Sequence, residues 1–445
     1  MLDEKTAPAV TDSRATSRPE PTPKPELFVI VLVGDTGLNA HAMPVNPTKA
    51  RRHGRGYPWE FTTRGIKDLI DGHINFANIE TVVTEDNRLR PGGKRFTFKM
   101  HPNGARHLVD IGFNVFSLAN NHTADYGVGG IRDSIRHTEA LRTSGLRAHA
   151  GLGLDRARAI QPDIFTVGRA RFAFSAMGIG ARQPGTARAG EKKPGQVNIY
   201  GERDYNSVVD ALASAPADFR ILSMHFGAER SVRPLPGQVR KWRDATQYDR
   251  DIDLIVGHHA HVVQGVQMNR GKLIFYGLGN FLHMGMQDMG KFNACRDYGL
   301  LARVFVVRQP NGSFETKAVQ AVPLIDMHLN ARPITGKRGH QRIEILNELA
   351  RELDAPESGS RGVRFTPQSD GSGLFCTPDA ANGPGRLAAL CKGYTPPPEI
   401  SAARKRRIRQ MCASAPRVAK ARKTPRKRAQ RKRKVWDGRS AFSRN

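Results

Sequence analysis

The sequence predicts an α/β domain with a large sheet system over residues 27–330. Between these limits, short apolar runs bounded by Gly, Asn and His alternate with amphipathic stretches, which is typical of alternating strands and helices. The chain has 445 residues, of which 39% are hydrophobic. That is enough to build a sizeable core, so the composition excludes a wholly disordered protein.

The strands are expected at the short apolar runs, which are residues 27–33, 75–80, 113–119, 164–168, 171–177, 219–224, 252–256, 273–277 and 301–307. Helices fit between several of these runs, at residues 60–71, 102–111 and 129–144. In the last segment, Ile131, Ile135 and Leu141 lie at spacings that place them on one helix face.

The segments outside this domain have a different composition. Residues 1–26 are polar and rich in proline, so we expect a disordered leader. For residues 331–394 we expect a poorly defined extension, with one helix at 341–353 followed by a Gly/Ser/Pro-rich stretch. Residues 395–445 begin with Thr-Pro-Pro-Pro-Glu and continue as a basic tail that we expect to be disordered.

Most of the excess positive charge lies in this tail. The chain carries 70 Lys and Arg against 41 Asp and Glu, a formal net charge of +29. Residues 401–445 contain 18 Lys and Arg and a single acid, Asp437, so about +17 of the net charge is there. The tail therefore suggests an arm that binds nucleic acid or an acidic membrane. A basic extension without a specific partner is the alternative.

The cysteines and the apolar runs of the sequence are used to predict the cellular compartment. The four cysteines, Cys295, Cys376, Cys391 and Cys412, are few for a chain of this length and contain no CxxC pair, so we expect no disulfide framework and a reducing compartment. The longest apolar run has seven residues, far fewer than the roughly 20 that span a bilayer. No signal peptide or membrane anchor is recognised, so a soluble cytoplasmic protein is expected.

Potential metal ligands follow five of the predicted strands. In open α/β sheets the active site lies outside the carboxyl ends of the strands, so ligands in these positions can converge. Mixed carboxylate, amide and imidazole donors suit Mn²⁺, Fe²⁺ or Zn²⁺ better than Ca²⁺. The candidates, in strand order, are Asp35, Glu80, the Asn120-Asn121-His122 segment, His225, and His258, His259 and His261.

Each candidate also has a purely structural interpretation. Gly-Asp after a strand is often only a turn, which would explain Asp35. His225 can be a core histidine with satisfied hydrogen bonds, and Asp125 can be a helix cap. Glu80 is harder to explain, because an acid that closes an apolar strand is costly to bury without a partner. Three histidines within Gly257–His261 are also hard to explain as packing.

The same residues carry a family resemblance. The ordered blocks closely resemble the bacterial poly-γ-glutamate capsule synthesis protein family, CapA, which is a branch of the metallo-dependent phosphatase-like superfamily. The resemblance spans roughly residues 27–285. Its blocks are Gly34-Asp35, Asn78-Ile79-Glu80, Ala119-Asn-Asn-His-Thr-Ala-Asp-Tyr-Gly127, His225-Phe-Gly-Ala-Glu229, Gly257-His-His-Ala-His261 and Tyr276-Gly-Leu-Gly-Asn-Phe281.

The resemblance implies a metallophosphatase-like αββα sandwich, in which helices flank two mixed sheets, with a di-metal site at the strand ends. By the family pattern, Asp35 is a ligand of the first metal and Glu80 is the bridging carboxylate. His122 would protonate a leaving group. The remaining ligands would be Asn121, His225, His259 and His261, and further residues at the metals or the substrate would be Asn120, Asp125, His258, Glu229 and Asn280.

This chain departs from the metallophosphatase pattern in two places. The first strand usually ends in Asp-x-His, whereas Asp35 is followed by Thr36-Gly37, and His41 is the nearest histidine that could replace the missing ligand. The three histidines of the fifth block also leave open whether His258 or His259 binds metal. One or two bound ions are therefore both compatible with the sequence.

Two functions from different classes remain. The first is a metal-dependent hydrolase, in which a metal-activated water attacks a phosphoester or an amide, such as a γ-glutamyl bond, of an anionic substrate or polymer. The second is a non-catalytic component of poly-γ-glutamate or capsule polymer synthesis or export.

Overall fold

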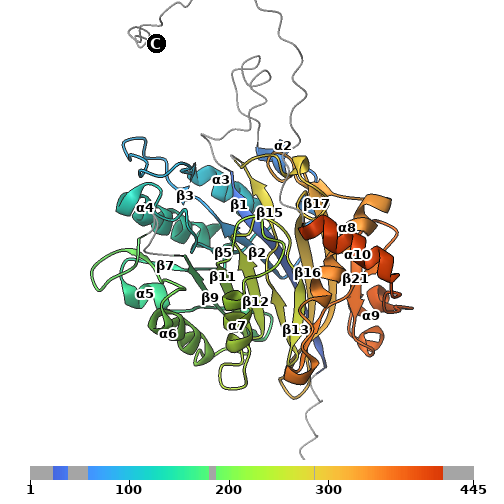
Figure 1. The fold of residues 1–445 in the computed structure, drawn as a ribbon. Helices are drawn as coiled ribbons and strands as arrows, with labels where there is room; N and C mark the ends of the chain where they lie inside the picture. Colours follow the sequence, from blue (N-terminus) through green and yellow to red (C-terminus); the bar gives the residue numbers. More distant parts are fainter. Residues whose placement is uncertain (1–23, 39–58, 180–186, 285, 414–445) are drawn as a thin grey trace, which may run out of the picture.

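Two facing β-sheets with helices on their outer sides make up the fold (Figure 1). The computed structural model describes residues 24–38, 59–179, 187–284 and 286–413. The expected α/β sandwich is confirmed.

The first sheet holds the amino-terminal strand in its centre. Its order is β20-β21-β17-β16-β1-β2-β5-β6, with β1, β2, β5 and β6 parallel and the strands beyond β16 antiparallel. β15 runs parallel to the end of β1, and β18 pairs with β17. The bounds are β1 Glu26–Gly37, β2 Ile74–Ile79, β5 Val115–Ser117, β6 Ala148–Ala150, β15 Asn280–His283, β16 Gly299–Arg308, β17 Phe314–Ile325, β18 Arg332–Pro333, β20 Thr366–Pro367 and β21 Gly373–Cys376.

The second sheet has the order β19-β13-β14-β12-β11-β9-β8. Its central strands β9, β11, β12 and β14 are parallel. The bounds are β8 Asp163–Val167, β9 Ala170–Gly178, β11 Phe219–His225, β12 Leu254–His258, β13 Val266–Asn269, β14 Lys272–Phe275 and β19 Ser360–Gly362. Two short ladders pair β3 (Val82–Val83) with β4 (Lys99–Met100) and β7 (Leu152–Gly153) with β10 (Gly195–Gln196).

Helices cover the outer faces of both sheets. α3 and α4 pack on the first sheet, and α6 and α7 pack on the second. The α-helices are α2 Trp59–Thr63, α3 Pro102–Asp110, α4 Gly127–Ala140, α5 Arg156–Ile160, α6 Glu202–Ala213, α7 Pro236–Ala245, α8 Gly336–Arg351, α9 Arg386–Cys391 and α10 Ala402–Ala413. Short 3-10 turns lie at Lys67–Leu69, Leu141–Ser144, Met289–Lys291, Pro356–Ser358 and Ala380–Asn382.

Strand β1 illustrates why the sequence forms this sandwich. Alternate side chains of a strand point to opposite faces. Phe28, Ile30 and Leu32 are buried between the two sheets, whereas Val31 and Val33 are buried against the helices of the outer layer. A strand that is covered on both faces has to be apolar throughout, and the run from Leu27 to Val33 meets that requirement.

The expected strands are all present, with ends shifted by a few residues. The helix expected at 60–71 is instead two short pieces, α2 and the turn Lys67–Leu69. Gly65 lies between them, where a glycine lowers helix propensity.

The boundary expected at residue 330 is not a structural boundary. In the segment 331–394, α8 contributes Ile343 and Leu346 to the core between the sheets. β21 pairs with β17 and so extends the first sheet. The expectation of a poorly defined extension was wrong, because short strands such as β20 and β21 are specified by the sheet edge they join and not by a long apolar run.

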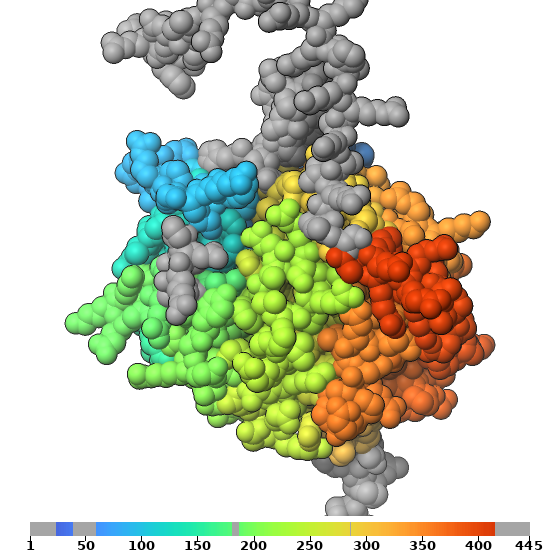
Figure 2. Space-filling model, viewed as in Figure 1, coloured from blue at the N-terminus to red at the C-terminus, as the bar shows by residue number. Residues whose placement is uncertain are grey.

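The first residues of the basic tail are ordered, which corrects the expected disorder over 395–445. α10 packs against α8, with Arg404 paired to Glu344 and Arg409 to Glu348, both at 2.7 Å, and with Ile408 buried. In Figure 2 this helix (red) lies on the surface beside the segment coloured orange. Residues 414–445 and 1–23, which hold most of the expected tail and leader, lie outside the described residues.

All four cysteines form disulfides, which contradicts the expectation of none. Cys295 pairs with Cys412, with their Cα atoms 5.4 Å apart, and Cys376 pairs with Cys391, at 6.0 Å. The sequence did not reveal the first pair, because its members are 117 residues apart and meet only when α10 docks. Stable disulfides are typical of oxidising compartments, so the argument from the cysteines for a reducing compartment fails, and the cytoplasmic location is not confirmed. Among the described helices, none is both long and apolar enough to cross a bilayer.

Candidate metal centre

The polar residues that follow five strands meet at one place between the two sheets. Asp35 lies near the end of β1 and Glu80 directly after β2, whereas His225 ends β11. Asn121 follows β5, and His259 and His261 follow β12. All six side chains are buried. The predicted convergence of Asp35, Glu80, Asn121, His225, His259 and His261 is therefore present in the structure.

One group of three candidate ligands contains Asp35, Glu80 and His261. One donor atom from each lies within 4.8 Å of the other two. His261 Nδ1 is 3.0 Å from Asp35 Oδ2 and 3.7 Å from Glu80 Oε2. The group combines residues from both sheets: Asp35 and Glu80 lie at the ends of β1 and β2 in the first sheet, and His261 follows β12 in the second.

A second group contains Glu80, His225 and His259, again with donor atoms within 4.8 Å of one another. His225 Nε2 is 3.5 Å from Glu80 Oε1 and 3.1 Å from His259 Nδ1. Asn121 Oδ1 adds an oxygen 2.7 Å from the same His225 nitrogen. Glu80 is common to both groups, as expected of a bridging carboxylate.

Unpaired buried oxygens are the best test of whether these residues fit a metal. Within the described residues, both carboxylate oxygens of Glu80 and Oδ2 of Asp35 are buried without a hydrogen-bond partner. A buried carboxylate is costly unless a cation or hydrogen bonds compensate it. The mixed oxygen and nitrogen donors suit divalent first-row metals. The donor set therefore fits a pair of such ions that share Glu80.

The charges of the site shift the pKa values of these groups strongly. Burial and the charge of Asp35 raise the pKa of Glu80, but His261 and His225 outweigh them and the pKa falls to about 2. Burial lowers the pKa of His261, yet Glu80 and Asp35 raise it to about 10. Burial, together with the charge of His261, lowers the pKa of His259 to about 4. Burial raises the pKa of Asp35, but hydrogen bonds from His258 and His261 lower it below its usual range, so both carboxylates are held ionised.

The turn after β12 has an unusual backbone. His259 and His261 have φ angles of 86° and 56°, in the left-handed region that residues other than glycine rarely adopt. Each such residue costs roughly 1–3 kcal/mol, and such residues cluster at functional sites. Gly257 is required just before the turn, because a Cβ there would lie 2.2 Å from the carbonyl oxygen of Tyr276. The strained turn brings both imidazoles into the site.

His122 lies beside the two ligand groups and is held by Asp125. His122 Nδ1 is 2.6 Å from Asp125 Oδ2, which also accepts a hydrogen bond from the backbone N–H of Phe98. Lys94 Nζ is 2.7 Å from the other Asp125 oxygen. The opposite ring nitrogen, Nε2, faces Glu80 at 4.0 Å. Burial lowers the pKa of His122, although the hydrogen bond to Asp125 acts in the other direction.

Two of the remaining predicted residues contact this centre. Asn280 Oδ1 lies 2.9 Å from His261 Nδ1. His258 lies outside both groups of three ligands. Its Nδ1 is 3.2 Å from Asp35 Oδ1, and its ring stacks on Phe76. The geometry therefore places His259, and not His258, in the second group.

Three other predicted residues have different surroundings. Asn120 shapes the turn after β5, because its side chain donates to the Ile79 carbonyl and accepts from the backbone N–H of His122. Glu229 is exposed and lines a cavity at the site. His41 lies outside the described residues.

Sequence reasoning missed two buried residues at this centre. Asn78 Nδ2 donates to Asp35 Oδ1 at 2.9 Å and lies 3.2 Å from His225 Nδ1. His283 Nε2 is 3.2 Å from Glu80 Oε2. Asn78 was detectable as a polar residue inside the apolar run before Glu80. His283 is a single histidine at the end of a short apolar stretch, a pattern more often explained by packing.

A cavity of about 490 Å³ opens beside the two ligand groups. His122 and His261 form part of its wall, together with Glu229, Arg230 and Arg95. Within the described residues, neither arginine has an ion-pair partner, so both are available to an anion in the cavity. The cavity gives a substrate access to the candidate ligands.

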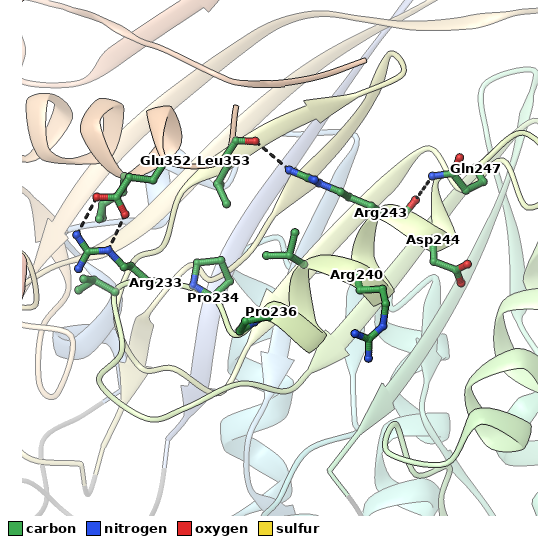
Figure 3. Close-up of a pocket in the computed structure, with 12 residues that line it drawn as sticks. Arg233, Pro234, Pro236, Arg240, Arg243, Asp244, Gln247, Glu352 and Leu353 are labelled. Atoms are coloured by element: carbon green, nitrogen blue, oxygen red, sulfur yellow. Dashed lines mark hydrogen bonds and ion pairs between the residues drawn. The ribbon is translucent and has the colours of Figure 1, made fainter. Parts of the chain in front are cut away.

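A wider cavity, of about 710 Å³, lies between α7 and the end of α8 (Figure 3). None of the candidate ligands lines it. Two of its arginines already have partners, because Arg233 pairs with Glu352 and Arg243 donates to the Leu353 carbonyl. We assign the chemistry to the smaller cavity because the candidate ligand His261 and the neighbouring His122 form part of its wall.

The sequence matches the family described as bacterial capsule synthesis protein PGA_cap over residues 29–284, which is more than half of the chain. The chain belongs to this family. The matched segment includes both candidate ligand groups and the His122–Asp125 pair, so the centre lies in the part of the chain that family members share.

Several relatives carry related names. A "Probable polyglutamine synthesis accessory protein" of Mycobacterium tuberculosis is 30% identical over 231 residues, covering 50% of this chain and 59% of that protein. The "Capsule biosynthesis protein CapA" of Bacillus anthracis is 25% identical and covers 72% of each chain. The "PGA biosynthesis protein CapA" of Bacillus subtilis is 26% identical, covering 62% of this chain and 67% of the relative.

One solved structure resembles the fold weakly. It is a hypothetical protein from Thermus thermophilus, 13% identical, with a TM-score of 0.36, covering 69% of this chain and 100% of that chain.

Proposed function

We propose that this protein is a metal-dependent hydrolase that cleaves an amide or phosphoester bond in an anionic substrate. The observation that carries the proposal is the sharing of buried Glu80 by two groups of candidate ligands, with His122 beside them and a cavity in front. Two buried donor groups with a common carboxylate are the arrangement used in two-metal hydrolytic sites.

Mn²⁺, Fe²⁺ or Zn²⁺ is the metal that the donor set favours, because carboxylate, amide and imidazole ligands occur together. Bound metal would supply Lewis-acid activation of water and of the substrate oxygen. Asp35, Glu80 and His261 would hold one ion, and Glu80, His225, His259 and Asn121 would hold the other.

In this proposal His122 acts in its protonated form, in which Asp125 holds Nδ1–H and Nε2–H supplies the proton to the leaving group. Asp125 accepts from Nδ1 and so leaves Nε2 directed toward the centre. This arrangement orients the ring in the same way as a carboxylate that fixes a catalytic histidine. A positioned acid of this type contributes typically 10²–10⁴ in rate.

The substrate is an anion, since Arg95 and Arg230 line the cavity without ion-pair partners among the described residues. The printed names of the relatives refer to polyglutamine, capsule and PGA biosynthesis. We therefore infer a role in poly-γ-glutamate synthesis, with a γ-glutamyl amide as the first substrate to test and a phosphoester as the second.

A second candidate function is a non-catalytic component of poly-γ-glutamate synthesis or export, which the word "accessory" in the mycobacterial name favours. In that case the cavity would bind the polymer and leave it intact. The basic residues 401–445 are proposed, for either function, to bind a polyanion such as nucleic acid, an acidic membrane or the polymer itself.

The decisive experiment is hydrolysis by protein of known metal content. Elemental analysis establishes the bound metal, and γ-linked glutamate oligomers and a chromogenic phosphodiester are then offered as substrates. The hydrolase proposal requires turnover that disappears on chelation and returns with Mn²⁺, Fe²⁺ or Zn²⁺. Binding of the oligomer without cleavage, by metal-loaded protein, would establish the non-catalytic function in its place.

A further inference from the structure

Arg296 is a buried cation for which the function proposed above has no role. It is only 5% exposed, and among the described residues its guanidinium contacts carbonyl and amide oxygens and no carboxylate. Burial and the nearby charge of Arg233 lower its pKa, as expected where no acid offsets them. A buried charge without an acid partner is costly, so the groups that it does bind have to explain it.

The hydrogen bonds of Arg296 connect two parts of the chain that are far apart in sequence. Its Nη2 donates to the carbonyl of Cys412 and its Nε to the carbonyl of Arg230, both at 3.0 Å. Cys412 lies near the end of α10, whereas Arg230 lines the cavity beside the candidate metal ligands. Arg296 therefore bridges α10 and the wall of the cavity.

The end of α10 explains why a positive charge is placed here. The last carbonyls of a helix lack partners within the helix and carry a partial negative charge. Arg296 binds one of them, on Cys412, and Asn293 Nδ2 donates to another, on Met411, at 2.9 Å. The disulfide between Cys412 and Cys295 ties this end of the helix to the same segment. Arg296 thus caps α10 from outside the helix.

The backbone of Arg230 is held from both sides. Its φ angle is 62°, in the left-handed region that residues other than glycine rarely adopt. Its N–H donates at 2.7 Å to the carbonyl of Ala260, which lies between His259 and His261, and its own carbonyl accepts from Arg296. A backbone of this kind persists only where the surroundings hold it. These two hydrogen bonds therefore fix the residue whose side chain lines the cavity.

We propose that Arg296 is a positioning residue, which fixes Arg230 at the cavity and makes its position depend on the docked end of α10. The proposal rests on the function proposed above, in which Arg230 is available to the anionic substrate. If the end of α10 is displaced, Arg296 loses the Cys412 carbonyl and becomes a buried cation with fewer acceptors, so it turns toward solvent and releases Arg230. Arg296 and α10 both lie beyond residues 29–284, the part of the chain that matches the family.

Amide hydrogen exchange in the full-length protein tests the positioning without any substrate. Exchange is followed by mass spectrometry of peptides that cover residues 226–232. The variant is Arg296→Met, which keeps an unbranched side chain and removes the guanidinium. Arg220→Met is the matched control, because Arg220 donates in the same way to carbonyls at the end of α6, those of Leu212 and Ala213, and does not line the cavity.

Arg296→Met should raise the exchange rate of residues 226–232 at least about tenfold, because the segment opens more often once its carbonyl partner is gone. In protein loaded with Zn²⁺, KM for a γ-linked glutamate oligomer should rise about tenfold. The kcat and the metal content should change little, because Arg230 contributes to substrate binding and not to proton transfer. Arg220→Met should match the unaltered protein in all of these measurements.

Unchanged exchange of residues 226–232 would overturn the proposal, and so would faster exchange with an unchanged KM. If Arg296→Met does not fold, Arg296→Lys decides the matter by the same criteria, since it keeps the charge but replaces the planar fork of donors by a single nitrogen. Where the unaltered protein cleaves nothing, the dissociation constant of the oligomer takes the place of KM. Faster exchange in a protein that neither binds nor cleaves the oligomer would sink the proposed function and leave the hold of Arg296 on Arg230 in place.

Discussion

Asp125 holds His122 in one orientation, with 2.6 Å between the carboxylate oxygen Oδ2 and the ring nitrogen Nδ1. The carboxylate is fully buried and is itself fixed by the backbone N–H of Phe98 and by Lys94. The imidazole therefore directs its other nitrogen toward Glu80 and the cavity. A histidine that serves only as a helix-start residue would not need so many constraints.

The first prediction follows from this pair. His122→Ala should lower turnover by at least about 10² and leave the metal content unchanged, because it removes a proton donor and no metal ligand. Asp125→Asn should lower turnover by at least about tenfold, since an amide does not hold the ring in the same protonation state. Steady-state rates and elemental analysis of the same preparations measure both effects.

His137→Ala is the matched control, because His137 is on α4 and outside the centre. It should keep both rate and metal. If His122→Ala instead empties the metal site, His122 is a ligand and the roles proposed here are reversed.

The second prediction distinguishes the shared ligand from the unshared ones. His225→Ala and His261→Ala each disturb one of the two groups, so each should retain about one metal per chain. Glu80→Gln keeps the size of the side chain but removes the charge common to both groups, and should retain less than about one. Metal per chain after dialysis is the measurement.

Glu202→Gln serves as the control for that series, since Glu202 is an exposed carboxylate of α6 that pairs with Lys241 and belongs to neither ligand group. Its metal content should equal that of the unaltered protein. Full metal retention by Glu80→Gln would show that the two groups do not share a carboxylate.

Much of the centre could be predicted from sequence because its residues directly follow apolar strands. Asp35, Glu80 and His225 each close such a run, and parallel strands bring their carboxyl ends to one edge. His283 could not be predicted in this way. Its position beside Glu80 depends on a bulge and on the register with β1, and neither leaves a mark in the local sequence.

Beyond residue 330, too, only part of the fold could be predicted from the local sequence. α8 has a helical pattern of its own, and the helix expected at 341–353 lies largely within it. α10 has hardly any apolar face, and Ile408 and Cys412 are its only buried residues in the described chain. Its order comes from ion pairs to α8 and from a disulfide, which are long-range contacts that composition cannot reveal.

The third prediction separates the ordered helix from the rest of the basic tail. Removing residues 414–445 should leave the free energy of unfolding nearly unchanged, because α10 and Cys412 remain. It should abolish most retention on heparin or nucleic acid, and that retention in the full chain should fall steeply with salt. Denaturant unfolding and salt-gradient elution are the measurements.

Removing residues 402–445 is the matched longer truncation. It deletes α10 and leaves Cys295 unpaired, so stability should fall by about 4–5 kcal/mol, as expected for a disulfide that closes a loop of this length. Equal stability of the two truncated proteins would mean that α10 does not clamp the fold. If the protein without residues 414–445 still binds polyanions as strongly as the full chain, these residues are not the binding segment.

The last prediction compares the two disulfides and bears on where the protein works. Cys376 and Cys391 are only 15 residues apart, so replacing both with serine should cost about 3 kcal/mol, roughly 2 kcal/mol less than replacing Cys295 and Cys412. Protein alkylated at the moment of cell lysis should show no reactive thiols, and should show all four only after reduction and unfolding. Because such bonds persist where the surroundings are oxidising, four thiols that react without reduction would instead restore the reducing compartment expected from the cysteine count.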